Sequence, residues 1–367
     1  MPPRVIFVIM NLPRSTVLLC LTTSLCVAQV RARNVVLFLG DAGGIPTLSA
    51  ASIYGYQAPQ KLYVQRMAHI GLSDTSASNS WVTDSAAGMT AIVTGHKVGN
   101  GVLSQTPEGE PLKTILEYAE EKGLSTGVVS NMNMADATPA ACYSHVDSRK
   151  KFGEIFSQVW TPRFGDGVDF MFGGGRSRIT ESLKEMNVDV EEKLRASGRP
   201  YYPSLSDVPA DGRKAVVLVD GNDFPVDQAT AKAIHLLSRN PKGYFLMVEW
   251  DLHPTRPEKA LQTVLEFDRL IEKTAKELAG PDTLIIFVAD HSFDFRLRSG
   301  KRSQPLSLPE DAKESAAGKF DVAVGTSHTG EEVLVAAQGP GSERIQGFMP
   351  NTAIFQVMLS AFGWAAR

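Results

Sequence analysis

Three aspartates and three histidines of this sequence stand at the ends of apolar runs, where their side chains could act together. They are Asp41, Asp251 and Asp290, and His253, His291 and His328. The sequence has only three cysteines, so a metal site has to use carboxylate and imidazole ligands, a mixture that zinc accepts. Six such residues could serve two ions. The other histidines, His69, His96, His145 and His235, lack this setting and are expected to be structural or exposed.

A serine stands where a nucleophile could be placed. Ser85 lies in the segment WVTDSAAGMT (residues 81–90), just before small residues that are fit to begin a helix. One interpretation is an N-cap, because Thr, Asp and Ser are common at that position. The other is a nucleophile, because the free amides and positive dipole at a helix N-terminus favour a serine oxyanion and a bound phosphate. Ser85 does not stand in a G-x-S-x-G motif, so a metal would have to activate the hydroxyl.

The elements that must position these residues are strand-like apolar runs that alternate with segments of helical period. The runs cover residues 34–39, 127–130, 215–219, 244–248, 284–289 and 333–337. Their continuous apolarity suits strands that are covered on both faces. The sequence therefore predicts an α/β fold with a mainly parallel central sheet sandwiched by helices. Such sheets bind ligands at the carboxyl ends of their strands, which is where Asp41, Asp251 and Asp290 stand.

Two polar segments are expected outside this framework. Residues 298–319 are rich in Ser, Pro and charge and are expected to form a surface loop, and residues 176–213 are expected to form a polar excursion with one short helix.

The N-terminal segment predicts export. Arg14 precedes an apolar run over residues 17–27, which ends at the small residue Ala28. We expect a signal peptide over residues 1–28, with Met10 as an alternative start, and one domain over residues 29–367. The run is too short for a membrane span, although an uncleaved anchor remains the alternative. A periplasmic or secreted protein without a stable membrane span follows, and Cys142 would be its lone thiol.

The net charge excludes a global field for polyanions. The 367 residues contain 37 basic and 40 acidic side chains, which give a net charge of −3. We therefore expect no nucleic-acid-binding surface, and any anion must be held by local groups.

Several short motifs, in their order along the chain, resemble the alkaline phosphatase family. They are TDSAA at residues 83–87, DATPA at 136–140, ADHS at 289–292 and HTG at 328–330, and Gly40-Asp41 fits the first motif of the family. The resemblance runs from about Asn34 to the C-terminus. It implies the three-layer fold of that family, with residues 29–367 as its catalytic domain.

The resemblance also implies a role for each matching residue. Ser85 matches the nucleophile that becomes a phosphoserine, and Arg149 matches the arginine that clamps the phosphoryl oxygens. The implied cofactors are two Zn²⁺ and one Mg²⁺. The first zinc set is Asp41, Asp290 and His291, the second is Asp251, His253 and His328, and the magnesium set is Asp136, Thr138 and Glu249 with Asp41 as a bridge. Two metals can stabilise the entering and departing oxygens of a displacement at phosphorus, and a guanidinium offers a fork for two others.

One departure from the family pattern concerns a ligand. Asp251 and His253 are two residues apart, whereas many relatives separate the carboxylate and imidazole by four, so the role of His253 stays open. Asp41 is followed by Ala42-Gly43-Gly44, where the family more often has Gly-Met-Gly. This difference changes the turn and leaves the carboxylate in place.

The function that the residues and the resemblance favour is an exported, metal-dependent phosphatase. It would hydrolyse small phosphate monoesters through a phosphoserine and release inorganic phosphate. A phosphodiesterase of the same superfamily and an exported, non-catalytic protein that binds metal or phosphate are the alternatives. Sulfatases are disfavoured, because Ser85 is followed by Ala86 and Ala87 without the Pro and Arg that they use. The resemblance also implies a homodimer, for which the sequence shows no interface.

Overall fold

The structure is a computed structural model that describes residues 31–221 and 224–365. The chain separates into two units, Met1–Val30 and Arg31–Arg367, and the second unit is described below. The signal peptide expected over residues 1–28 lies outside the described residues. Among the described helices, none is both long enough and apolar enough to cross a membrane.

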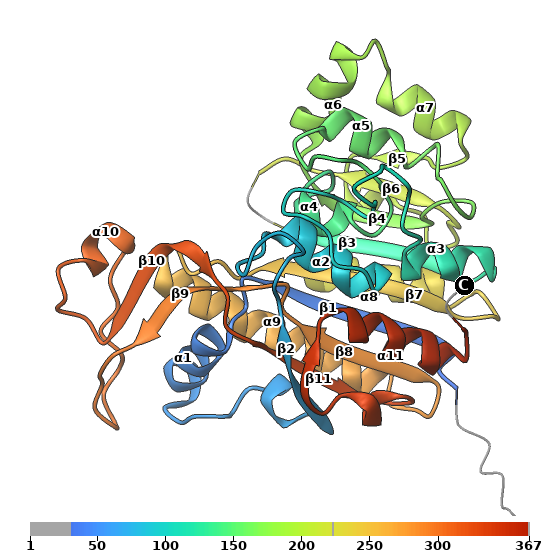
Figure 1. Cartoon of the computed structure of the whole chain (residues 1–367). Helices are drawn as coiled ribbons and strands as arrows, with labels where there is room; N and C mark the ends of the chain where they lie inside the picture. The colour runs from blue at the N-terminus through green and yellow to red at the C-terminus, as the bar shows by residue number, and fades with distance from the viewer. Residues whose placement is uncertain (1–30, 222–223, 366–367) are drawn as a thin grey trace, which may run out of the picture. The chain divides into compact units, whose positions relative to one another are not determined.

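A large sheet forms the centre of this unit, and a small one stands beside it (Figure 1). The strands are β1 (Asn34–Asp41), β2 (His69–Asp74), β3 (Ser125–Asn133), β4 (Phe170–Gly174), β5 (Tyr201–Tyr202), β6 (Ala215–Leu218), β7 (Tyr244–Asp251), β8 (Thr283–Val288), β9 (Ser292–Leu297), β10 (Val322–Thr329), β11 (Val333–Gln338) and β12 (Gly347–Pro350). The large sheet has ten strands in the order β12-β2-β11-β8-β1-β7-β3-β4-β6-β5. Its described neighbours are parallel except for the two pairings of β11, so the expected mainly parallel sheet is confirmed.

Helices cover both faces of the large sheet. They are α1 (Ile45–Tyr56), α2 (Ser85–Thr94), α3 (Ile115–Glu121), α4 (Ala137–Ala140), α5 (Phe152–Ser157), α6 (Arg176–Glu185), α7 (Val190–Ala196), α8 (Val226–Leu237), α9 (Pro257–Glu277), α10 (Ala312–Ser315) and α11 (Thr352–Phe362), with the short 3₁₀ turns η1 (Val64–Arg66), η2 (Leu205–Asp207) and η3 (Ser342–Arg344). One apolar core joins the sheet to α2, α3 and α11, and a second core joins its other face to α1, α8 and α9. This is the three-layer architecture expected from the sequence.

The two cores follow from the alternation of side chains along each strand. In β1, Val35, Leu37 and Leu39 belong to the core on the α2 face. Val36 and Phe38 belong to the core on the α9 face. Because successive side chains of a strand point to opposite faces, Asp41 is placed on the α2 face with Leu39. The strand pattern thus decides on which side of the sheet the first carboxylate lies.

The six apolar runs all fall on strands of the large sheet, and the two polar segments differ in how well they were predicted. The loop expected at residues 298–319 contains only the short helix α10. The excursion at residues 176–213, by contrast, holds two helices, α6 and α7, together with β5, which pairs with β6 at the edge of the sheet. The expectation of one short helix there was wrong. Ile179 and Leu183 of α6 and Leu194 of α7 are buried, and these few apolar positions are enough to anchor two mostly polar helices.

The small sheet carries His328 and begins directly after His291. Strands β9 and β10 pair in antiparallel fashion, and His328 lies opposite Phe293, two residues beyond His291. The pairing is irregular between Val324 and His328. This hairpin therefore brings residues that are 37 positions apart in the sequence to one place at the carboxyl end of β8.

Helix α2 approaches the end of β8 so closely that its fourth residue, Gly88, has to be glycine. A Cβ atom built on Gly88 would lie 2.8 Å from the carbonyl oxygen of Asp290 and 3.2 Å from its Cβ. Both atoms belong to or adjoin the backbone, so they cannot swing aside. The absence of a side chain at Gly88 thus lets α2 and Asp290 lie against one another.

We expect Gly88→Ala to lower the free energy of unfolding by about 1–3 kcal/mol, because the new methyl overpacks the contact with Asp290. Helix propensity alone predicts the opposite sign, since alanine is favoured over glycine in a helix by up to about 1 kcal/mol. Urea denaturation followed by circular dichroism measures the difference. Gly55→Ala in α1 is the matched control, because its Cβ would meet only the side chain of Leu265. A stabilised Gly88→Ala variant would contradict this account of the packing.

Candidate active site

Three buried acidic side chains meet at the carboxyl ends of adjacent parallel strands. Asp41 ends β1 and is the register partner of Asp251, which ends β7. Glu249 lies opposite Leu39 in the same pairing, and Asp290 follows β8 by two residues. Asp41, Glu249 and Asp290 are 4%, 1% and 0% exposed, so charges that normally face water are here withdrawn from it. Such a group of carboxylates needs positive partners in order to stay ionised.

The turn after β1 holds Asp290 in place at the expense of some backbone strain. Ala42 has a φ of 59°, in the left-handed region that residues other than glycine seldom adopt. In this conformation the amide of Ala42 donates to Oδ1 of Asp290 at 3.3 Å, and the amide of His291 donates to the same oxygen at 3.0 Å. The other oxygen, Oδ2, is buried without a hydrogen-bond partner. Oδ2 lies 3.6 Å from Nε2 of His291, and an oriented carboxylate oxygen without a hydrogen bond is the state expected of a ligand atom.

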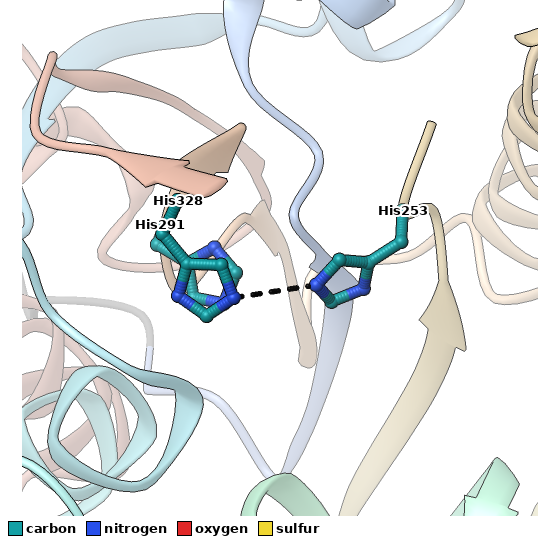
Figure 2. A group of neighbouring side chains, drawn as sticks. All are labelled: His253, His291 and His328. Carbon is teal, nitrogen blue, oxygen red and sulfur yellow. Dashed lines mark hydrogen bonds between the residues drawn. The ribbon is translucent and has the colours of Figure 1, made fainter. Parts of the chain in front are cut away.

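Three histidines cluster beside these carboxylates, and Figure 2 shows their rings facing one another. The rings of His291 and His328 stack with their centroids 3.7 Å apart, and Nε2 of His253 lies 3.5 Å from Nε2 of His328. Nδ1 of His253 lies 2.7 Å from Oδ1 of Asp251, and Nδ1 of His328 lies 3.1 Å from the carbonyl oxygen of Thr83. The imidazoles therefore come from three separate segments and present their nitrogens to a shared space.

These side chains make up groups whose ligand atoms all lie within 4.8 Å of one another. Among the described residues three such groups occur: Asp41 with Asp290 and His291, Asp41 with Asp251 and His253, and the three histidines together. The first group has the same members as the first expected zinc set. Asp41 belongs to two groups, which places its carboxylate between them. Each of these groups could hold a metal ion.

Electrostatics link these carboxylates and imidazoles. Burial raises the pKa of Asp41, but the neighbouring His253 and His291 more than offset it and lower that pKa to about 2. Burial also raises the pKa of Asp290, and the nearby charge of Asp41 raises it further, to about 6. Burial lowers the pKa of His291, whereas Asp290 and Asp41 together raise it to about 9. In the metal-free protein, protonated imidazole thus supplies the positive charge that the buried carboxylates require.

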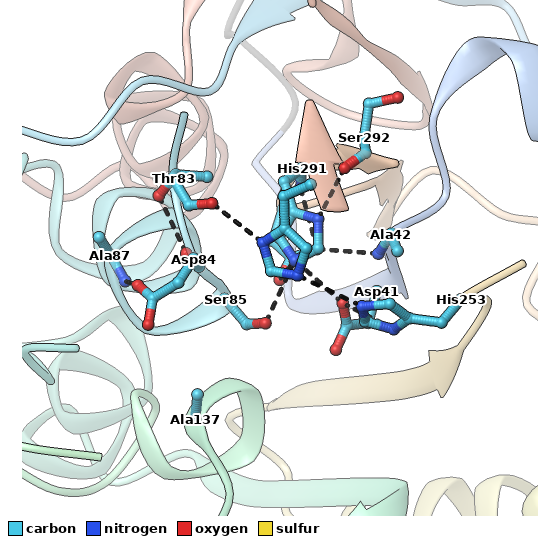
Figure 3. A network of polar contacts seen from close by, with 12 residues as sticks. Asp41, Ala42, Thr83, Asp84, Ser85, Ala87, Ala137, His253, His291 and Ser292 are labelled. Carbon is cyan, nitrogen blue, oxygen red and sulfur yellow. Dashed lines mark hydrogen bonds and ion pairs between the residues drawn. The ribbon is translucent and has the colours of Figure 1, made fainter. Parts of the chain in front are cut away.

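Ser85 is the first residue of α2, and it is not the residue that caps the helix. Asp84 occupies the cap position, and its Oδ1 accepts a hydrogen bond from the amide of Ala87 at 3.1 Å. The hydroxyl of Ser85 is therefore free for other contacts, and it lies 3.2 Å from Nε2 of His291 (Figure 3). Its side chain is buried and sits beside the free amides of the first helical turn. The capping interpretation of Ser85 is wrong, because the preceding aspartate fills that role.

Arg149 lies beside the N-terminus of α2, where it contacts the capping residue Asp84. One guanidinium nitrogen donates to Oδ2 of Asp84 at 3.1 Å, and another donates to Oδ1 of Asp136 at 2.8 Å. The amide of Arg149 also donates to the carbonyl oxygen of Gly101, whose own amide donates to Asp84. Two carboxylates and a backbone contact thus orient a planar fork of donors next to the N-terminus of α2.

The expected magnesium set is less closely assembled than the first expected zinc set, and the second expected zinc set, Asp251 with His253 and His328, is not found as one group among the described residues either. Glu249 accepts a hydrogen bond from the hydroxyl of Ser130, while Asp136 is held by Arg149. Burial raises the pKa of Glu249 well above its usual value, and the charges of Asp41 and Asp136 add to this. In the described part of the chain, Asp41, Asp136 and Glu249 do not form a group with ligand atoms within 4.8 Å. The Oγ1 atom of Thr138, the remaining member, is buried without a hydrogen-bond partner.

Sequence reasoning missed the residues that hold this machinery in position. Asp84 orients Arg149, and Ser130 holds Glu249. Asp84 stood in the recognised motif, but an aspartate next to a serine at a helix start gives no sign of a distant arginine partner. Of the remaining histidines, His145 is buried against Glu117, and His96 and His235 are exposed. Cys142 is a buried free thiol.

Comparison with known proteins agrees with this geometry. The family model described as "Alkaline phosphatase" matches residues 32–202 and 219–324, which is more than half of the chain. An alkaline phosphatase of Escherichia fergusonii is 29% identical, and the match covers 90% of this chain and 86% of the relative. The solved structure of alkaline phosphatase from the Antarctic bacterium TAB5 has a TM-score of 0.78 at 26% identity, over 92% of this chain and 100% of the other.

A further solved structure contains a metal. It is a mutant of the TAB5 enzyme, His 135 Asp, with Mg bound in its M3 site, and it has 28% identity and a TM-score of 0.76 over 92% of this chain and 100% of the other. The extent of the family match, the relatives and the shared fold lead to the same assignment. The chain belongs to the alkaline phosphatase family and is a hydrolase of phosphate monoesters.

Proposed function

We propose that this enzyme transfers the phosphoryl group of its substrate to Ser85 and then hydrolyses the phosphoserine. The observation that carries the proposal is the hydroxyl of Ser85, which is uncommitted to capping and lies 3.2 Å from Nε2 of His291 at the start of α2. In the first step the Ser85 oxygen forms a bond to phosphorus while the bond to the ester oxygen breaks, and the alcohol departs with a proton. In the second step water attacks the phosphoserine, which releases inorganic phosphate and restores the hydroxyl.

Arg149 is proposed to hold the phosphoryl group during both steps. Its planar guanidinium matches two non-bridging oxygens of a phosphate, which a lysine could not do. The free amides at the N-terminus of α2 add further donors and a positive dipole end. A monoester dianion gains more from these groups than a diester, which has one negative charge fewer. This supports monoesterase activity over the phosphodiesterase alternative.

We further propose that the enzyme works with two Zn²⁺ and one Mg²⁺. Asp41, Asp290 and His291 would hold the first zinc, and Asp251, His253 and His328 the second, with Asp136, Thr138 and Glu249 as the magnesium set. Three buried atoms that lack a hydrogen-bond partner, Oδ1 of Asp41, Oδ2 of Asp290 and Oγ1 of Thr138, fit such roles, since buried polar atoms are normally satisfied. When bound, such ions lower the pKa of a coordinated oxygen and stabilise charge on the entering and leaving oxygens. The Mg-bound TAB5 mutant supports a magnesium ion in this fold.

Export of the enzyme, to the periplasm or the medium, is part of the same proposal. It rests on Arg14, the apolar run over residues 17–27 and the small residue Ala28.

Replacing the nucleophile should separate chemistry from metal binding. We expect Ser85→Ala to lower kcat for p-nitrophenyl phosphate by about 10³-fold or more while the metal content stays unchanged, because the hydroxyl forms the bond to phosphorus. Acid quenching during turnover of a ³²P-labelled substrate should trap label on the wild-type protein and none on the variant. Ser80→Ala, in the same loop, is the control. Covalent label on Ser85→Ala, or activity close to that of the wild type, would refute the covalent route.

The arginine fork can be tested through product inhibition. We expect Arg149→Lys to raise the inhibition constant of inorganic phosphate by about tenfold and Arg149→Ala by more, because charge-assisted hydrogen bonds are lost. Zinc content should not change. Lys150→Ala, at the adjacent position, serves as the control. If Arg149→Lys bound phosphate as tightly as the wild type, the fork would not be what holds the phosphoryl group.

The affinity of the metal-free protein for zinc should rise with pH. Metal binding requires neutral imidazole and ionised carboxylate, yet the pKa of His291 is raised to about 9 and that of Asp290 to about 6 in the metal-free protein. Below pH 9 a proton must therefore leave His291, so zinc affinity should rise between pH 6 and pH 9 by roughly tenfold per unit for each proton released. Competition with a chromophoric zinc chelator measures it after EDTA treatment and dialysis. An affinity that is independent of pH over this interval would contradict the charge balance.

A further inference from the structure

A cavity of about 420 Å³ adjoins the active site next to His253. Its size falls in the range of about 300–1,000 Å³ that is typical of small-molecule sites. Its walls include the active-site residues Asp251 and His253 and, around them, Trp250, Arg256, Lys259 and Glu266. No role in phosphoryl transfer has been given to the last four of these residues.

The direction of the reaction leads into this cavity. Ser85 and His253 lie on opposite sides of Asp41 (Figure 3). In a displacement at phosphorus the attacking and leaving oxygens stand roughly in line. With Ser85 as the attacking group, the alcohol part of the ester points away from α2 and toward His253. This step rests on the proposed function, and it makes the cavity the place where the leaving group lies.

The charge of the cavity is unevenly distributed. Arg256 directly precedes α9 and Lys259 lies in its first turn, and both side chains are exposed. Within the described residues neither takes part in an ion pair or a side-chain hydrogen bond. Glu266 is seven residues beyond Lys259 on the same helix, which is about 10 Å further along its axis. Asp251 belongs to a candidate metal group, so its charge is committed there. The end of the cavity nearest His253 therefore offers two unpaired cations.

We propose that this cavity selects phosphate monoesters whose alcohol part carries a second anionic group. Arg256 and Lys259 are the specificity-determining residues, and they bind that group while Arg149 and Ser85 hold the phosphoryl group. Trp250, half-buried between α9 and the site, forms an apolar wall for the carbon skeleton between the two charges.

Two esters that differ only in this charge test the proposal. They are 4-(carboxymethyl)phenyl phosphate and its methyl ester, which is neutral at the same position and whose ring is electronically similar because the methylene group insulates it from the charge. We expect the wild-type enzyme to prefer the carboxylate by about five- to tenfold in kcat/KM, as one or two partly exposed charge pairs provide. In the double variant Arg256→Gln, Lys259→Gln the ratio should fall to about one, with the rate for the methyl ester nearly unchanged.

The matched control changes the net charge equally outside the cavity. Lys273→Gln, Lys276→Gln alters two exposed lysines near the other end of α9 and should keep the wild-type ratio. A wild-type enzyme without a preference, a double variant that keeps the preference, or a control that loses it would each overturn the proposal. The last result would mean that the overall field and not the cavity attracts the anion.

A binding measurement keeps this test independent of catalysis. Saturation-transfer NMR compares 4-hydroxyphenylacetate, the leaving group itself, with its methyl ester on the wild-type protein and on the double variant. We expect the acid to bind more tightly than the ester to the wild-type protein, and the two to bind equally to the double variant. Equal binding of the two by the wild type would refute the cavity assignment even if hydrolysis is seen. Failure to hydrolyse either phosphate, with selective binding intact, would instead refute the proposed function alone.

Discussion

The cost of burying negative charge governs the whole active-site edge of the sheet. Asp41, Glu249 and Asp290 are almost inaccessible to water, and a single isolated carboxylate in such surroundings would take up a proton rather than stay ionised. Imidazoles from three segments lie close to the carboxylates and offset their buried negative charge. The N-terminus of helix α2 lies in the same region. The charges on His291 and Asp290 are matched to one another: each shifts the pKa of the other toward the ionised form. Removing the imidazole of His291 or the carboxylate of Asp290 would leave a buried charge without its opposite charge.

Several features of the fold exist because these charges have to converge. Parallel strands bring Asp41 and Asp251 into register at one edge, and the strained turn at Ala42 directs an amide at Asp290. Gly88 removes the side chain that would keep α2 away from the same residue. The left-handed backbone of Ala42 costs roughly 1–2 kcal/mol. The hydrogen bond from its amide to the buried carboxylate of Asp290 offsets this cost. At this edge of the sheet, an alanine with a positive φ and a glycine inside a helix are retained because both allow contacts to Asp290.

Much of this could be predicted from the sequence, because the signals were local. Continuous apolar runs located six strands, and their ends located Asp41, Asp251 and Asp290. What the sequence could not provide was pairing across large separations. The contact of Arg149 with Asp84 joins residues 65 positions apart, and nothing in either segment encodes it. The stacking of His291 on His328 depends on the register of a hairpin, in which a shift of one residue would send one ring to the other face. Likewise, the two helices at residues 176–196 are held by a few buried apolar side chains, which are hard to recognise in a mostly polar segment.

Asp251 and His253 are only two residues apart, and the local backbone conformation explains how their side chains nevertheless meet. Strand β7 continues in register with β1 as far as Asp251, and then Leu252 turns to the opposite face, where its amide donates to the carbonyl oxygen of Asp41. Gly40 and Gly43 leave room for Leu252, since a Cβ atom on them would lie 2.6 Å and 3.1 Å from its Cδ1. The chain forms a tight turn after Leu252, in which both the amide and Nδ1 of His253 lie against Oδ1 of Asp251. A buried leucine fitted between two glycines thus allows this carboxylate and this imidazole to meet across a spacing of only two residues. The same sharp turn leaves His253 at the margin of the cavity beside α9, so the feature that departs most from the family pattern is also the one that joins the reacting centre to its surroundings.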